Sequence, residues 1–178
     1  MEELEDPTER LKETMEAAEE KKERWTMHVA LSTAIIAVLA AIAGLYGNHH
    51  ANEAMLDQIK SSDQWAYYQS KSIKAEIAAS TAQMLAAFDK PLPKENEDKM
   101  KKYEKDKADI KELAESAEKS SEGHMRQHIV LSRAVTIFQI AIAISAIAIL
   151  TRRKLMWYAS MLLAAAGSVF LVLGFMTS

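Results

Sequence analysis

Three long runs without a charged side chain constrain this sequence more than any other feature. The first run, 29–46, holds 18 residues, which as a helix extend about 27 Å, close to the hydrocarbon thickness of a bilayer. The other two runs are 134–150 and 155–176. Only 5 Gly and 3 Pro occur in 178 residues, so long helices are favoured over strands. The sequence therefore predicts an all-α membrane protein with three transmembrane helices.

The segments flanking these runs are short or polar. Residues 151–154 are Thr-Arg-Arg-Lys, and so short a basic connector predicts a turn between two antiparallel spans. Residues 1–28 are expected to form an amphipathic helix that starts with Asp6 as N-cap and Pro7 at the first helical position. This segment holds ten acidic and five basic residues, a net charge of −5. That charge opposes tight docking to anionic lipid, so bundling with other copies or a plain helical extension is expected.

Residues 47–133 are predicted to form a long antiparallel helical hairpin outside the membrane, between the first and second spans. The stretch 48–88 has neither Gly nor Pro, so it can be one uninterrupted helix. The tip, 89–96, reads DKPLPKEN and contains the only closely spaced pair of prolines in the chain, which predicts the turn. A second helix then returns toward the second span.

An apolar stripe on the first arm predicts a coiled-coil-like contact with the second. Its positions advance 33 residues in nine steps, close to an eleven-residue repeat. If Phe88 faces Glu95, then His124 lies opposite Ile59. Many stripe positions are small and bury little area, so neighbouring hairpins are expected to share the burial. The stripe consists of Met55, Ile59, Ser62, Ala66, Ser70, Ile73, Ile77, Thr81, Met84 and Phe88.

The distribution of Lys and Arg near the spans predicts the orientation. Eight such residues lie on the side of the amino terminus and the 151–154 turn, and four lie on the hairpin side within about 20 residues of the spans. Basic residues favour the cytoplasmic side of a membrane. We therefore expect a cytoplasmic amino terminus, with the hairpin and the carboxyl terminus on the opposite side.

Two groups of residues are candidates for contacts between subunits. One is an aromatic cluster on the first arm, whose rings point to several sides of a helix and exceed what one partner arm can cover. The other combines the one strongly polar side chain within the spans with a face of small residues on the third span. The candidate contacts are Trp65, Tyr67, Tyr68, Gln139, Ser160, Ala164, Gly167 and Gly174.

Histidines are the most tempting candidates for a metal site, because His124 and His128 are four residues apart on one helix. The pairing of the arms, however, places them farther from the membrane than His49 and His50. The four are thus not expected to meet, and His124 and His128 are expected to form part of a polar collar rather than a metal site. We find no nucleophile with a base and no phosphate-binding loop. The sequence predicts no enzyme, cofactor or nucleic-acid partner.

The order of segments also resembles a known bacterial family. The resemblance is carried by DQWAYYQSKSIKAEIA, by the proline-broken tip followed by KKYEKDKADIKELAE, and by the closing pair of spans. It extends from about Glu23 onward and is most specific over 63–77. The family is domain of unknown function 4337. The resemblance implies a bacterial envelope protein, hence the inner membrane, and brings no catalytic or ligand residues with it.

Together these features favour a non-enzymatic, homo-oligomeric scaffold or stalk in the membrane, assembled through its hairpins and the small-residue faces of its spans. Two alternatives stay open. In the first, the same oligomer encloses a channel lined by Gln139 and the small faces of the spans. In the second, the chain is an accessory subunit of a larger membrane complex. All three place the protein in contact with membrane lipid.

Overall fold

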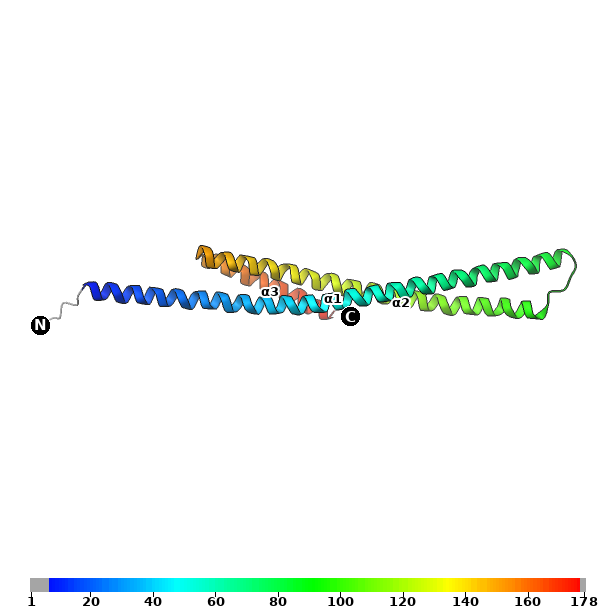
Figure 1. Cartoon of the computed structure of the whole chain (residues 1–178), viewed down its shortest axis with the longest axis horizontal. Coiled ribbons are helices and arrows are strands. Elements are labelled where there is room, and N and C mark those ends of the chain that lie inside the picture. Colours follow the sequence, from blue (N-terminus) through cyan, green and yellow to red (C-terminus); the bar gives the residue numbers. More distant parts are fainter. Residues whose placement is uncertain (1–6, 177–178) are drawn as a thin grey trace. The chain divides into compact units, whose positions relative to one another are not determined.

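Three helices make up residues 7–176, the part of the chain that the computed structural model describes, with side chains from Arg10 onward. They are α1 (Pro7–Ala87), α2 (Lys94–Thr151) and α3 (Lys154–Met176) (Figure 1). No strand occurs within 7–176. The predicted all-helical class is confirmed, and each helix is long and apolar enough to cross a membrane. The expected N-cap, Asp6, lies outside the described residues.

The contacts divide the chain into two units. The span unit contains the described residues up to Gly47 together with those from Ile129 onward. The arm unit contains residues 48–128. Both α1 and α2 contribute residues to each unit. Gly123 does not interrupt α2, because a glycine within a helix costs only about 1 kcal/mol relative to Ala.

Backbone hydrogen bonds explain why α1 ends at Ala87. Asp89 has a φ of 53°, the left-handed conformation in which many helices terminate. The Asp89 amide donates to the Ala86 carbonyl at 3.1 Å, and the Lys90 amide donates to the Leu85 carbonyl at 2.9 Å. This pair of bonds is the Schellman motif. Pro91 follows directly, and α2 starts one residue after Pro93.

Small side chains make the contact between the two arms. On α1, Ala54, Ser61 and Ala75 are buried, and with the half-buried Tyr68 they recur every seven residues. The arms are antiparallel, because Ser61 contacts Ala114 whereas Ser121 contacts Ala54. The buried residues of the second arm are Ile110, Ala114, Ala117 and Ser121.

The stripe predicted to form this contact is wrong in both face and period. Met55 is 63% exposed, Ile73 58% and Phe88 71%. The distance between packed helices depends on the side chains at their contact. Ala and Ser permit the closest approach, and the larger Met and Ile side chains of α1 are consequently turned outward.

The predicted register of the arms is also wrong, by about two and a half helical turns. His124 contacts His50 instead of Ile59, a displacement of nine residues. The reason lies at the tip, where the end of α1 extends past the start of α2 (Figure 1). Residues 88–93 form a loop rather than a tight reversal, so Phe88 and Glu95 are not opposite each other.

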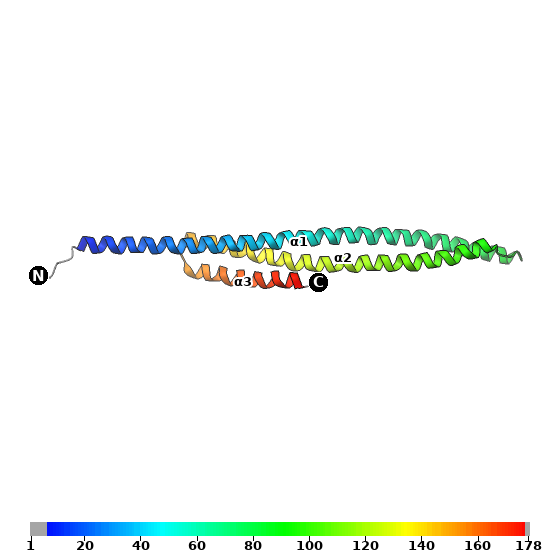
Figure 2. The ribbon, with the colours of Figure 1, turned by 90° about the horizontal axis from the view of Figure 1, so that it is seen from below.

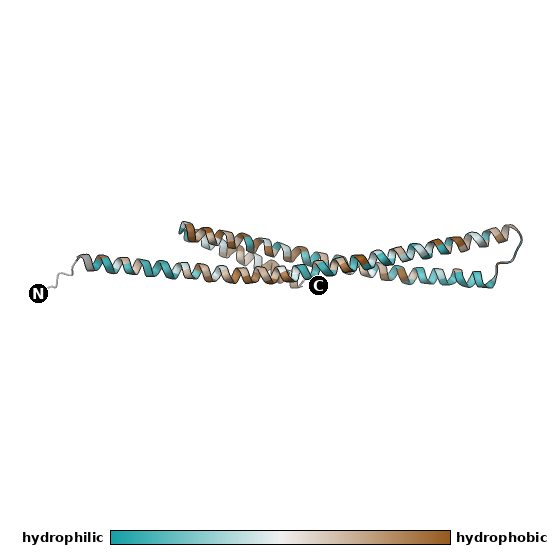
Figure 3. Cartoon of the chain, in the orientation of Figure 1, coloured by the Kyte–Doolittle hydropathy of each residue, from teal (hydrophilic) through white to brown (hydrophobic). Residues whose placement is uncertain are grey.

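The span unit has a core in which all three helices take part. Figure 2 shows α3 beside α2, and Figure 3 shows how strongly apolar these segments are. Hydroxyl groups also join the helices. The Ser160 hydroxyl donates to the Ala141 carbonyl at 2.9 Å, and the Trp157 indole donates to Ser32 at 3.1 Å. The buried core consists of Ile36, Ala43, Leu131, Ala134, Phe138, Ala141, Ala164 and Leu171.

Two glycines let α3 approach α2. A Cβ atom at Gly167 would lie 2.9 Å from two ring carbons of Phe138, and one at Gly174 would lie 2.5 Å from a methyl carbon of Leu131. Phe138 and Leu131 are both fully buried, so neither can move aside freely. The glycines are therefore required by the closeness of the two helices.

We predict that Gly167→Ala lowers the thermal midpoint of the purified protein in detergent, because overpacking of a filled core costs about 1–3 kcal/mol. Far-UV circular dichroism during heating measures the midpoint. Gly44→Ala is the matched control, since its added Cβ meets only Val135, at 3.9 Å. Equal midpoints for the two variants would contradict this account of the α2–α3 contact.

Candidate functional site

The inner surface of the arm unit is held by hydroxyl groups as well as by packing. The Ser61 hydroxyl donates to the Ala114 carbonyl at 3.2 Å, and the Ser121 hydroxyl donates to the Ala54 carbonyl at 2.8 Å. Each arm thus supplies one buried serine that bonds to the backbone of the other. A buried hydroxyl must find such a partner, and these bonds help to set the register. A search for small residues at seven-residue spacing, rather than for large apolar ones, finds this surface in the sequence.

An ion pair joins the arms nearer the tip. Lys71 donates to Asp106 at 2.6 Å, and the side chains are only 13% and 27% exposed. The Lys71 ammonium also lies 5.2 Å from the ring centre of Tyr67 and 5.7 Å from that of Tyr103. The hydrogen bond between Lys71 and Asp106 raises the pKa of Lys71 and lowers the pKa of Asp106. Both groups therefore stay charged across the neutral range.

The aromatic cluster proposed as a subunit contact is partly covered within the chain. The rings of Trp65 and Tyr68 meet edge to face with centres 5.5 Å apart, and Lys107 lies 5.8 Å from the Tyr68 ring centre. Trp65 and Tyr68 are both half-buried. Tyr67 is 50% exposed. Of the three, Tyr67 offers the most surface to another molecule.

Histidines from the two arms meet, although the sequence predicted that they would not. The Nδ1 atoms of His50 and His124 are 3.0 Å apart, and the rings stack with centres separated by 5.2 Å. Burial, and then the neighbouring His124, lower the pKa of His50. One of the two nitrogens donates to the other, which requires a neutral acceptor. Among the described residues, no three His, Asp or Glu side chains form a group that could hold a metal.

The small-residue face of α3 is covered within a single chain. Ser160, Ala164, Gly167 and Gly174 are all buried, and the contacts of the two glycines lie on α2. We therefore leave this face out of the proposed interface between copies. Gln139, by contrast, is exposed on α2.

Large apolar side chains cover the outside of the first arm. We define the outer apolar face as the six large apolar residues of the predicted stripe, five of them on α1 and one in the loop that follows it. Each of the six is more than half exposed. The outside of the second arm differs, since the first part of α2 is mostly hydrophilic (Figure 3). The outer apolar face consists of Met55, Ile59, Ile73, Ile77, Met84 and Phe88.

We predict that Asp106→Asn destabilises the arm unit at neutral pH, because Lys71 then loses its charged partner. The lowered pKa of Asp106 means that this stabilisation is present above the ordinary carboxylate pKa and is lost as pH falls through the lowered value. The difference in thermal midpoint between wild type and variant should therefore vanish as the pH is lowered through that pKa.

Glu95→Gln is the control for this experiment. Glu95 pairs with Lys99, but both residues lie on α2 and are 76% and 52% exposed, so the pair joins no second helix. If the two variants shift the midpoint equally, or if the Asp106→Asn difference persists in acid, the inter-arm ion pair is not a determinant of stability.

Comparison with known protein families finds a match over most of the chain. The family described as Domain of unknown function (DUF4337) matches residues 25–177. No curated protein and no solved structure matches the chain. The match includes both arms and all three apolar runs. It agrees with the resemblance carried by residues 63–77 and by the proline-broken tip. The chain belongs to the DUF4337 family.

Proposed function

We propose that this protein is a non-enzymatic, homo-oligomeric scaffold of the bacterial inner membrane, whose paired arms assemble outside the lipid. The outer apolar face carries the proposal. Its residues are 53–71% exposed in the single chain, and an exposed apolar patch of several hundred Å² marks an interaction site. The arms themselves form a coiled-coil-like hairpin in this proposal, supported by the seven-residue spacing of their buried positions.

Lipid cannot cover this face. Exposed apolar residues of the predicted spans, such as Leu31 and Val38, suit a hydrocarbon environment. The arms instead carry charged residues throughout, including Asp57, Asp63 and Lys74, which would be costly to place in lipid. The outer apolar face is therefore best covered by protein.

A second copy of the chain fits the dimensions of the face. It extends over 34 residues, about 50 Å of helix, and with a width of about 10 Å it presents about 500 Å². Two copies would bury about 1,000 Å², the lower limit for a specific interface. Copies in one membrane share their orientation, so a twofold axis brings the same residues together. None of the six positions is charged, so the centre of the contact brings no like charges together.

We predict that Ile73→Ser with Ile77→Ser lowers the native mass of the particle in detergent, because two central apolar contacts are lost in every copy. Light scattering coupled to gel filtration measures the mass. Leu113→Ser with Met125→Ser is the matched control, since these residues are also exposed and apolar but lie on α2. A wild-type mass in the first variant would refute the interface. A monomeric wild type would instead favour the accessory subunit.

The orientation can be tested separately, because the chain contains no cysteine. We expect a cysteine at Lys94, near the tip, to react with a membrane-impermeant maleimide in intact cells. A cysteine at Lys12 should react only after the membrane is opened, since the greater number of basic residues lies on that side. The opposite labelling pattern would place the arms in the cytoplasm.

The channel is the second candidate, and the exposure of Gln139 favours it. An exposed amide within a span either bonds to another helix or lines a water-filled path. In the scaffold, Gln139 bonds to a neighbouring copy. Ion flux through vesicles containing the purified protein distinguishes the two, because a scaffold conducts nothing.

A further inference from the structure

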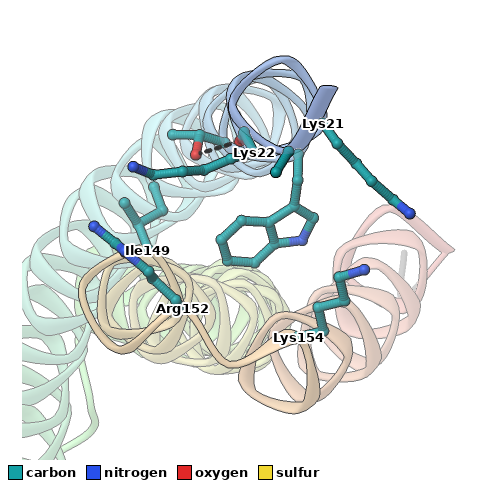
Figure 4. A pocket seen from close by; sticks show the side chains of 8 residues that line it. Lys21, Lys22, Ile149, Arg152 and Lys154 are labelled. Atoms are coloured by element: carbon teal, nitrogen blue, oxygen red, sulfur yellow. Dashed lines mark hydrogen bonds between the residues drawn. The ribbon is translucent and has the colours of Figure 1, made fainter. Parts of the chain in front are cut away.

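A cavity in the span unit lies between α1 and the turn that joins α2 to α3. Its volume is about 440 Å³. Lys21, Lys22 and Trp25 line it from α1, Arg152 lines it from the turn, and Lys154 lines it from the first residue of α3. Figure 4 shows Lys22 and Arg152 on one side of the cavity and Lys21 and Lys154 on the other. Four cationic groups from two separate segments thus surround one space.

Acidic side chains do not contact these cations within the part of the chain whose side chains the structure describes. No acidic residue lines the cavity, and none of the four basic residues takes part in an ion pair among the residues whose side chains are described. The many glutamates of the amino-terminal segment lie elsewhere on the helix, as Glu20 does in its pair with Arg24. Residues 1–28 carry a net charge of −5, but the face of this helix that lines the cavity is basic.

An unpaired hydrogen-bond donor lies at the same place. The Nε1 atom of Trp25 is buried and has no hydrogen-bond partner. Buried donors normally have an acceptor, so this donor is available to an acceptor that a ligand supplies. A ligand with negatively charged oxygens would satisfy both the indole and the four cations.

The position of the cavity indicates where that ligand comes from. Trp25 precedes the first predicted span by a few residues, and Arg152 and Lys154 lie between the second and third. If these helices cross the membrane, the cavity is at the depth of the lipid headgroups. Basic pockets between transmembrane helices on the cytoplasmic side bind anionic headgroups, and tryptophan is common at this level.

We propose that this cavity binds the phosphate of an anionic phospholipid headgroup. Lys22 and Arg152 supply charge from one side, Lys21 and Lys154 supply it from the other, and the Trp25 indole donates a hydrogen bond to a phosphate oxygen. The bound headgroup ties α1 to the α2–α3 turn. The inference rests on the proposed membrane location and not on the proposed assembly.

The test is native mass spectrometry of the full chain in detergent, with equal amounts of phosphatidylglycerol and phosphatidylcholine that carry the same acyl chains. The wild type should retain phosphatidylglycerol preferentially. Lys22→Gln with Arg152→Gln should reduce that retention at least about tenfold, as expected for two cations near a membrane surface. No preference in the wild type would overturn the proposal.

Two further variants separate this site from general charge attraction. Lys12→Gln with Lys119→Gln removes the same net charge outside the cavity and should leave retention unchanged; an equal loss would overturn the site. Trp25→Phe keeps an aromatic ring and the charge but lacks the N–H group, so retention should fall. Unchanged retention in Trp25→Phe would overturn the role assigned to the indole. Circular dichroism verifies that each variant keeps its helix content.

Inorganic phosphate distinguishes a lipid from a soluble ligand. We expect an excess of phosphate to leave phosphatidylglycerol bound, because the acyl chains hold the lipid at the cavity. Complete displacement would assign the cavity to a soluble anion and overturn the lipid source. The native mass of the same samples reports assembly independently, so a monomer that still retains phosphatidylglycerol separates failure of the scaffold from failure of this site.

Discussion

Close contact between small side chains is the interaction on which the rest of this structure depends. In the arm unit, Ser61 of α1 meets Ala114 of α2, and Ala54 meets Ser121. In the span unit, Gly167 and Gly174 leave room for the fully buried Phe138 and Leu131. Each contact lets two helix backbones approach closely, and the hydroxyl groups caught between them bond to carbonyls. Large apolar residues are then left on the outside of the helices.

The exposed apolar residues suit different surroundings in the two units. In the span unit they fit the hydrocarbon of a bilayer, which is as apolar as leucine itself. In the arm unit they lie among charged residues, where lipid is an unsuitable neighbour. Water is also a poor neighbour for six Met, Ile and Phe side chains on one face. We therefore propose that lipid surrounds one unit and protein covers the outer face of the other.

For the binding of an anion, the face of the helix on which the charges lie matters more than the net charge of the segment. The amino-terminal segment is acidic on average, and on that basis it was expected to avoid anionic lipid. Yet Lys21 and Lys22 share the face of Trp25, while Glu20 pairs with Arg24 away from the cavity. Field strength at a site follows the nearest charges, because salt screens those more than about 8–10 Å away.

The sequence by itself determined the secondary structure and the three apolar runs. Charge-free segments of bilayer length, scarce glycine and a single pair of prolines are local features, and no packing partner changes them. The tertiary structure decided which face of each helix is buried. Ala and Ser bury little area, so the sequence pattern favoured the larger Met55 and Ile73 as the contact, whereas the backbones approach most closely where side chains are small. The register of the arms brings His50 to His124 and Lys71 to Asp106, and the packing of the span unit places Trp25 and Arg152 at one cavity. These pairs are far apart in the chain, and only the packing of the helices brings them together.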